Sequence, residues 1–499
     1  MGADIDRDTF SPEEESRFVM RLQHCLTALE SLLGRPGFGE GQTRVGLELE
    51  LSLVGDDGRP LLRNQEVIAA TDVERVEVEL DRFNLEYNAR PVPLAGAPFT
   101  SLLDDVTEAL SGLRATAERF DGRIAAVGIL PTLRESDLQR DALTDVPRFR
   151  AISSRIRALR NAPFEVRVDG PEPIRITCDD VTLEGANTSL QIHLQVHPQR
   201  FARVFNAAQI ATAPVLALAG NSPVVAGRQG WEETRVAVFR QAVDDRGPSA
   251  RWSPARVSFG NGWLKSGAHE LFAEAVALHT PLLPVCSEEQ PLDVLAEGGT
   301  PGLDELRLHN GTVWRWNRPV YDPSDGGHLR IEFRSLPSGP TATDMLANVA
   351  LLLGLTAALA RESWWMTVAL PFRYAEYNFN EAARVGLDAT LLWPSKRAPS
   401  PRPVQVRTLL DELIPLADEG LESVGVLPEE RARHLDVLRA RLESGQTGSR
   451  WQRSTLIALE RDGMPRERAL VEMVDRYLEH SASERPVHEW PAPTTGRSS

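Results

Sequence analysis

A short alternating stretch near the N-terminus places the strongest constraint on this chain. In residues 45–54 leucine or valine occupies every second position, which is typical of a β-strand, and Glu48 and Glu50 share the opposite face. Two carboxylates on a half-buried strand face lose hydration and repel each other. We therefore expect a cation or a basic partner over this face of a sheet.

The same alternation returns in three later segments. Their polar positions are Asn84 and Glu86 in 83–89; Gln191, His193 and Gln195 in 188–196; and Arg330, Glu332 and Arg334 in 328–335. Each segment alone is also typical of a strand with one face in water. Solvated faces favour Thr, Lys and Ser, however, whereas these positions hold carboxylate, imidazole and guanidinium groups. The set therefore predicts one shared site.

The residue types at these positions indicate a particular chemistry. Oxygen ligands in the majority, with a single imidazole and no cysteine cluster, favour Mg²⁺ or Mn²⁺ over zinc. Arginines beside metal-binding carboxylates suit phosphate, and the combination is what phosphoryl transfer requires. Neither a P-loop nor a Gly-x-Gly-x-x-Gly turn after a strand occurs. A nucleotide would therefore be held through the metals.

The order of predicted elements indicates an α+β fold. Strands are separated by helices yet alternate polar and apolar residues, which predicts a largely antiparallel sheet with one polar, funnel-like face and helices on the other. The expected strands are 44–54, 73–79, 83–89, 123–128, 188–196, 311–316 and 328–335, and the expected helices are 11–33, 99–120, 148–160, 199–219, 231–243 and 341–361.

Periodicity also predicts the domain organisation. Residues 1–403 form the domain that carries the site, with the helix at 11–33 packed on its outside. Amphipathic helices at 404–418, 428–444, 452–462 and 466–481 form a helical C-terminal extension over 404–482. The last stretch, 483–499, is rich in Ser, Pro and Arg, and we expect it to be disordered.

Composition narrows the classes of partner. With 55 basic and 71 acidic residues the formal charge is −16, which argues against nucleic acid or an anionic membrane. Three cysteines without CxxC spacing fit a reducing cytoplasm, and no apolar leader or run of 18 apolar residues occurs. We expect a cytoplasmic protein that acts on small molecules. A homo-oligomer is compatible with the sequence.

Several segments resemble the glutamate–cysteine ligase family of the bacterial carboxylate-amine ligase type. They occur in the family's order over about residues 44–385, and they are VGLELELSLV, FNLEYNARP, TSLQIHLQV, NSPVVAGRQGWEETRVAVFRQAVDDR and GTVWRWNRPVYDPSDGGHLRIEFRSLPSGPT. The resemblance implies a glutamine-synthetase-like fold, in which a curved antiparallel sheet forms an active-site funnel for ATP, Mg²⁺ and an amino acid.

The resemblance also implies roles for individual residues. The metal ligands would be Glu48, Glu50, Glu86, His193 and Glu332; the catalytic arginines Arg334, at the γ-phosphate, and Arg330; the substrate contacts Arg235, Gln191 and Asn84; and the nucleotide contacts Gln195 and Arg318. Two departures stand out. Many members have three consecutive glutamates where Leu49 separates two here, and some have a second histidine at the position of Gln191.

The implied reaction is ATP-dependent amide formation. The γ-carboxylate of glutamate would attack the γ-phosphorus of ATP, and an amine, cysteine by resemblance, would displace phosphate from the acyl phosphate. Mg²⁺ or Mn²⁺ would be the cofactor and ATP a co-substrate. Three alternatives stay open: the same chemistry with another amine, a non-catalytic relative that binds a nucleotide or amino acid, and a metal-dependent phosphotransferase acting on a guanidine.

Overall fold

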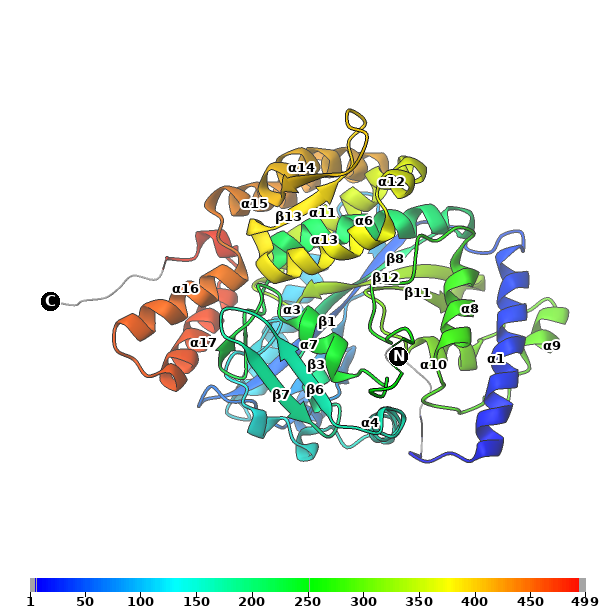
Figure 1. Cartoon of the computed structure of the whole chain (residues 1–499), viewed down its shortest axis with the longest axis horizontal. Coiled ribbons are helices and arrows are strands. Elements are labelled where there is room, and N and C mark those ends of the chain that lie inside the picture. Colours follow the sequence, from blue (N-terminus) through cyan, green and yellow to red (C-terminus); the bar gives the residue numbers. More distant parts are fainter. Residues whose placement is uncertain (1–4, 6, 251, 493–499) are drawn as a thin grey trace.

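One antiparallel sheet lies at the centre of the molecule (Figure 1). The computed structural model describes residues 5, 7–250 and 252–492. The strands of this sheet are β1 (Arg44–Gly55), β2 (Val76–Val78), β3 (Asn84–Asn88), β4 (Val92–Pro93), β5 (Gly122–Ala125), β8 (Ser189–Gln195), β11 (Asn317–Asp322) and β12 (His328–Pro337). The main path runs β11-β12-β8-β1-β3-β2, and β4 and β5 also pair with β1.

The register of this sheet collects the polar positions of separate strands on one face. All its strand pairs are antiparallel, and the aligned partners include Glu50 with Glu86, Glu48 with Gln191, and Glu332 with His193. The alternate residues of β1, among them Leu47, Leu49 and Leu51, are buried on the other face. The predicted antiparallel sheet with one polar face is confirmed.

Helices cover the apolar face of the sheet and form two further layers. They are α6 (Phe201–Ala219), α11 (Ala342–Arg361), α13 (Phe372–Val385) and α14 (Val406–Ser423), drawn above the sheet in Figure 1, and α3 (Pro98–Glu118), which packs against β1, β5 and α11. Helices α11 and α14 cross in close contact. A Cβ added at Gly420 would lie only 1.9 Å from the carbonyl oxygen of Gly354. Glycine at this crossing permits the contact.

The C-terminal helices share the core of the sheet domain. They are α14, α15 (Pro428–Ser444), α16 (Gly448–Arg461) and α17 (Arg466–Ala482). Arg441 of α15 forms a fully buried ion pair of 2.7 Å with Asp344 of α11. The hydroxyl of Tyr477 in α17 donates to the carbonyl of Ala126, just after β5. The boundary at 403/404 stays a prediction, but these helices pack into the molecule rather than standing apart from it.

The remaining elements lie around the polar face and at the ends of the sheet. Beside the polar face and the edges near it are α2 (Asn64–Ala70), α4 (Pro147–Arg160), α5 (Thr182–Gly185), α7 (Arg235–Ala242) and the hairpins β6 (Phe164–Val168)–β7 (Ile174–Cys178) and β9 (Val224–Val225)–β10 (Arg228–Gln229). Helix α1 (Pro12–Leu33) packs on α8 (Ala268–Leu278), α9 (Pro291–Ala296) and α10 (Asp304–Asn310), and α12 (Ser363–Ala369), β13 (Thr390–Trp393) and β14 (Arg402–Gln405) complete the fold.

The prediction of a strand at 311–316 is wrong. Residues 311–316 form a turn and an extended segment, and the strand follows at β11. The backbone N–H of Trp316 donates to the carbonyl of Ser258 at 3.0 Å, so a distant loop takes the bond that a sheet ladder would offer. Pro319 is accommodated in β11 because β11 is an edge strand.

The expectation of disorder over 483–499 is also wrong for residues 483–492. Val487 and Trp490 are buried, and the Trp490 ring packs edge-on against Trp451 at 5.0 Å. The backbone N–H of Val487 donates to the carboxylate of Asp344 at 2.9 Å. Two apolar side chains that find a surface on α15 and α16 order this segment. Residues 493–499 lie outside the described residues.

Two helices are long and apolar enough to cross a membrane by length and composition. They are 198–219 and 342–361. In each helix, 89% of the apolar stretch that meets this criterion is buried inside the protein. Both lie in the layers that cover the sheet, where a core helix needs the same apolar surface.

Candidate active site

A cavity of about 810 Å³ lies over the polar face of the sheet. Six of the residues singled out from the sequence line it, namely Glu48, Glu50, Glu86, Gln191, Arg318 and Arg334. They come from β1, β3, β8, β11 and β12, which lie next to one another in the sheet although they span almost 290 residues of chain. Strands that are separated by helices in the sequence thus supply one concave site. Helix α4 and the start of α5 close its other side.

One end of the cavity holds three carboxylates, Glu50, Glu79 and Glu86, which we call the acidic group. One oxygen of each lies within 4.8 Å of one oxygen of the other two. Glu50 accepts hydrogen bonds from the backbone N–H of Ser189 at 2.6 Å and from the amide of Gln191 at 2.6 Å. Within the described residues, none of the three carboxylates has a basic side chain as an ion-pair partner.

Burial and mutual repulsion disfavour the charged forms in the acidic group. Burial, together with the nearby Glu79, raises the pKa of Glu50 to about 7. Burial and the charges of Glu48 and Glu79 raise the pKa of Glu86 well above its ordinary value. Such a group is stable as carboxylates only when a cation lies among them.

The donor set of the acidic group fits a hard divalent cation. Three carboxylates offer oxygen ligands only, which Mg²⁺ and Mn²⁺ prefer, and their spacing allows a single ion to contact all three. The predicted metal ligands Glu50 and Glu86 therefore lie together. Their third neighbour is Glu79, rather than Glu48, Glu332 or His193.

The other end of the polar face holds charges that are already paired. Glu332 receives two hydrogen bonds of 2.8 Å from Arg318 and also pairs with Arg334. Nε2 of His193 lies 3.0 Å from the carboxylate of Glu48. We call these five residues the paired group. Glu332 and His193 lie beneath the cavity lining, while the two arginines and Glu48 reach it.

The paired group lowers the pKa of its carboxylates. Burial opposes ionisation of Glu332, but the guanidinium groups of Arg318 and Arg334 outweigh it and hold its pKa far below the ordinary value. Burial likewise opposes ionisation of Glu48, and the contact with His193 outweighs it and lowers the pKa. These carboxylates stay charged without a metal ion.

Four predicted contacts lie elsewhere than the cavity lining. The three guanidinium nitrogens of Arg235 donate to Glu233 and to backbone carbonyls that include those of Thr188 and Arg334, so Arg235 supports the irregular part of β12. Arg330 pairs with Asp322, the last residue of the edge strand β11, at 2.9 Å and does not line the cavity. Gln195 aligns with Arg330, and the amide of Asn84 donates to the carbonyl of Leu51. The structure gives these four side chains no place beside a ligand.

Three cavity residues were missed from the sequence. Glu79 follows β2 in the alternating run Val76-Glu77-Val78-Glu79, the same pattern as in β1, and this signal could have found it. Glu184 of α5 is half-buried, and desolvation with the charges of Glu79 and Glu50 raises its pKa to about 8. No sequence pattern marks it.

Arg148, the third of these residues, is the second residue of α4 and lines the cavity. Its side chain makes no hydrogen bond or ion pair within the described part of the chain. A cation in the first turn of a helix is opposed by the helix dipole, so the helix does not stabilise it. A half-buried guanidinium with free donors is suited to an anionic ligand.

Solved structures share this fold. Glutamate–cysteine ligase from Francisella tularensis, determined in complex with AMP, is 13% identical and aligns over 89% of this chain and 90% of that one, with a TM-score of 0.56. A bifunctional glutathione synthetase from Pasteurella multocida is 12% identical over 92% of this chain and 55% of that one, with a TM-score of 0.51. The predicted glutamine-synthetase-like fold is confirmed.

Sequence comparison identifies the family. A search of curated protein sequences gives no match. The family model for glutamate-cysteine ligase family 2 matches residues 44–476, which extends past the predicted limit of 385 and includes α14, α15 and α16. The chain therefore belongs to glutamate-cysteine ligase family 2.

Proposed function

We propose that this protein is an ATP-dependent ligase that joins the γ-carboxylate of glutamate to an amine. Cysteine is the acceptor that the family suggests. One observation carries the proposal: unpaired carboxylates from β1, β3 and the segment after β2, and arginines from β11 and β12 that are held by Glu332, face a single cavity. A ligand that carries both phosphates and bound cations matches this division of charge.

The acidic group would hold Mg²⁺, which supplies charge neutralisation and orientation for the phosphates of ATP. At the opposite end, Arg334 and Arg318 present guanidinium groups to the cavity while Glu332 fixes both from below. Fixed donors of this kind stabilise charge that develops on a transferring phosphoryl group, because they need no reorganisation during the reaction. Arg235 holds the backbone carbonyl of Arg334 at 2.8 Å and so positions that arginine.

Two displacement steps give the amide. An oxygen of the γ-carboxylate attacks the γ-phosphorus, the bond to ADP breaks, and an acyl phosphate forms. The nitrogen of the amine then attacks the acyl carbon, a proton leaves the nitrogen, and inorganic phosphate departs with the bonding electrons. Neither step uses a nucleophile from the protein, which agrees with a cavity whose residues orient and neutralise charge.

Arg148 supplies the missing contact for a substrate carboxylate. Both amino-acid substrates carry an α-carboxylate, and Arg235, which the resemblance implied to be a substrate contact, has its donors occupied. Arg148 has free donors and lies on the wall opposite the sheet. We assign it to a substrate carboxylate for this reason.

The test is an assay of phosphate release by the full chain with ATP, Mg²⁺ and glutamate, repeated with each of the twenty amino acids as acceptor. We expect release that requires glutamate and is fastest with cysteine. Glu50→Gln should abolish it, whereas Glu74→Gln, which removes an exposed carboxylate outside the cavity, should leave it unchanged.

The alternatives give different results in the same assay. Release that rises most with another amine would replace cysteine and keep the ligase. Binding of ATP without any release would indicate a non-catalytic relative. Phosphate transfer that does not need glutamate would contradict the proposal and favour a phosphotransferase.

A further inference from the structure

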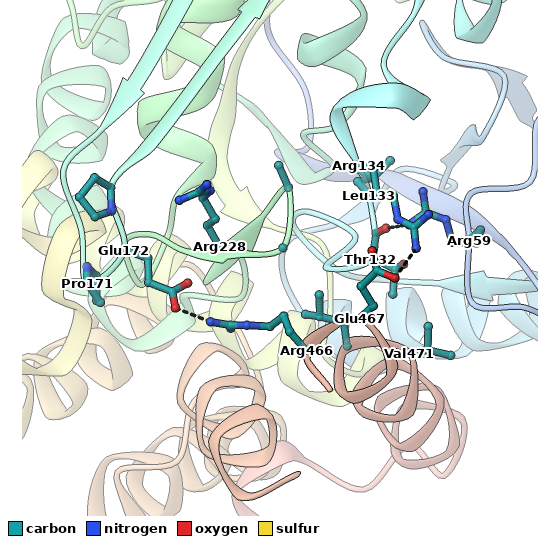
Figure 2. A pocket seen from close by; sticks show the side chains of 14 residues that line it. Arg59, Thr132, Leu133, Arg134, Pro171, Glu172, Arg228, Arg466, Glu467 and Val471 are labelled. Carbon is teal, nitrogen blue, oxygen red and sulfur yellow. Dashed lines mark hydrogen bonds and ion pairs between the residues drawn. The ribbon is translucent and has the colours of Figure 1, made fainter. Parts of the chain in front are cut away.

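A second cavity, of about 600 Å³, lies where the first turn of α17 meets the sheet domain (Figure 2). Four segments that are distant in sequence build it: the loop after β1, the loop after β5, and the turns of the β6–β7 and β9–β10 hairpins. It shares no lining residue with the cavity over the polar face. It is thus a cavity separate from the candidate active site.

The lining of this cavity is basic in an acidic protein. Its charged residues are Arg59, Arg134, Arg228 and Arg466 against Glu172 and Glu467. The whole chain carries a formal charge of −16. Four guanidinium groups line this cavity, and their mutual repulsion is relieved by nearby carboxylates and by whatever occupies the cavity.

Acidic residues orient two of these arginines and leave donors free. Arg466 pairs with Glu172 and, through Nε at 2.8 Å, with Glu460. Its Nη1 is buried and has no hydrogen-bond partner in the described residues. Figure 2 shows Arg466 and Glu172 on one side of the cavity and Arg59 on the other. Arg59 pairs with Asp137, which does not line the cavity.

Arg228 extends from the β9–β10 turn and is exposed. Across residues 5, 7–250 and 252–492 its side chain makes no ion pair or hydrogen bond. Arg134 makes one exposed contact, of 3.3 Å, with Glu467. The cavity therefore combines a guanidinium held in place by two glutamates, that of Arg466, and two guanidinium groups that can move toward a ligand, those of Arg228 and Arg134. Charge-assisted hydrogen bonds to an anion would use these free donors.

We propose that this cavity binds a small organic or inorganic anion with at least two phosphate or carboxylate groups. The volume exceeds what one phosphate group fills, and it falls in the range of sites for small metabolites. Donors lie on both the α17 side and the sheet-domain side, so a ligand with two anionic groups contacts both. Its binding ties the C-terminal helices to the catalytic half.

The test is calorimetric titration of the full chain with pyrophosphate and, separately, with citrate, both in EDTA so that metal-dependent binding over the sheet is suppressed. We expect one site with a dissociation constant below about 1 mM, weakened by added salt. Pyrophosphate binding alone would define a phosphate site, and citrate binding alone a carboxylate site. Arg228→Gln should weaken binding about tenfold, the loss of one charge-assisted contact.

The matched control is Arg402→Gln, which removes an exposed arginine from β14 on another part of the surface. It should bind as the unaltered chain does. Arg228 has no partner in the described residues, so its replacement should leave the melting temperature unchanged. Measuring that temperature first establishes that the variant is folded. Equal affinity in both variants, or no heat with either anion at millimolar concentration, would overturn the proposal.

Discussion

The two ends of the polar face use the same residue type in opposite ways. Glu86, in the acidic group, faces other carboxylates and has a raised pKa, whereas Glu332, in the paired group, faces two arginines and has a lowered one. Both side chains are buried, at 9% and 1% exposure. The opposite pKa shifts of Glu86 and Glu332 therefore come from the charges of their neighbours and not from a difference in burial.

This difference predicts which end depends on a ligand. The paired group is neutralised by the protein itself. Under the proposed function, the acidic group costs stability until the cation enters, and that stored repulsion becomes affinity for the cation. The comparison predicts opposite stability changes for the same substitution at the two ends.

Glu86→Gln should have the largest effect on activity. It removes a ligand of the expected Mg²⁺ site, so we expect kcat/KM of the ligase reaction to fall about 1000-fold, equivalent to several kcal/mol. In EDTA at pH 7 the same variant should be more stable than the unaltered chain by about 1–3 kcal/mol, because a neutral amide removes the repulsion. Activity assays and urea unfolding measure the two effects.

The control for Glu86→Gln is the Mg²⁺ dependence of unfolding. Mg²⁺ should raise the melting temperature of the unaltered chain and raise that of the variant much less. A variant that is destabilised in EDTA would show that the acidic group does not store repulsion.

Glu332→Gln should change stability in the other direction. The substitution leaves Arg318 and Arg334 buried without a counter-charge, so we expect a loss of about 3 kcal/mol in the free energy of unfolding, with or without Mg²⁺. Activity should fall as well, since both arginines lose their support. A stability equal to that of the unaltered chain would contradict the distinction between the two ends.

The contrast also explains what sequence reasoning could find. Glu48, Glu50, Glu86, Glu332 and the arginine at 334 were found because alternation fixes which face of a strand a side chain occupies, and adjacent antiparallel strands then align those faces. The same logic applied to the run at 76–79 would have given Glu79. Alternation is a local property, so it predicts faces well.

Alternation cannot predict which polar side chains find partners elsewhere. Arg235 resembles a substrate contact in sequence, but the carbonyl just before β8 and three carbonyls of β12 take its donors. Arg148 and Glu184 enter the cavity from helices that fold over the sheet, and their positions depend on long-range packing. The strand expected at 311–316 failed for the same reason, since a loop 57 residues away pairs with it.

Arg148→Gln tests the cavity wall that lies opposite the acidic group and the paired group. Because this guanidinium has no partner in the described chain, its loss should not reduce the free energy of unfolding. We expect the KM of one amino-acid substrate to rise about tenfold to 100-fold while kcat changes less. Initial rates with glutamate and with cysteine varied in turn show which carboxylate it binds. Arg150→Gln, on the same helix but outside the cavity, is the matched control, and an unchanged KM for both substrates would remove Arg148 from the site.

Glu184 gives the smallest expected effect and extends the comparison to pH. Burial, with Glu79 and Glu50, raises its folded-state pKa to about 8, above the ordinary 4.5. Stability from a group with a raised pKa is present at low pH and is lost as pH rises from 4.5 through 8, because the unfolded chain ionises first. In EDTA the unaltered chain should therefore lose more stability between pH 5 and 8 than Glu184→Gln does, by about 1–2 kcal/mol.

Urea unfolding at both pH values measures this, with Glu74→Gln as the surface control. Parallel pH profiles for the two proteins would show that Glu184 is ionised in the fold, and that the repulsion of the acidic group ends at Glu79.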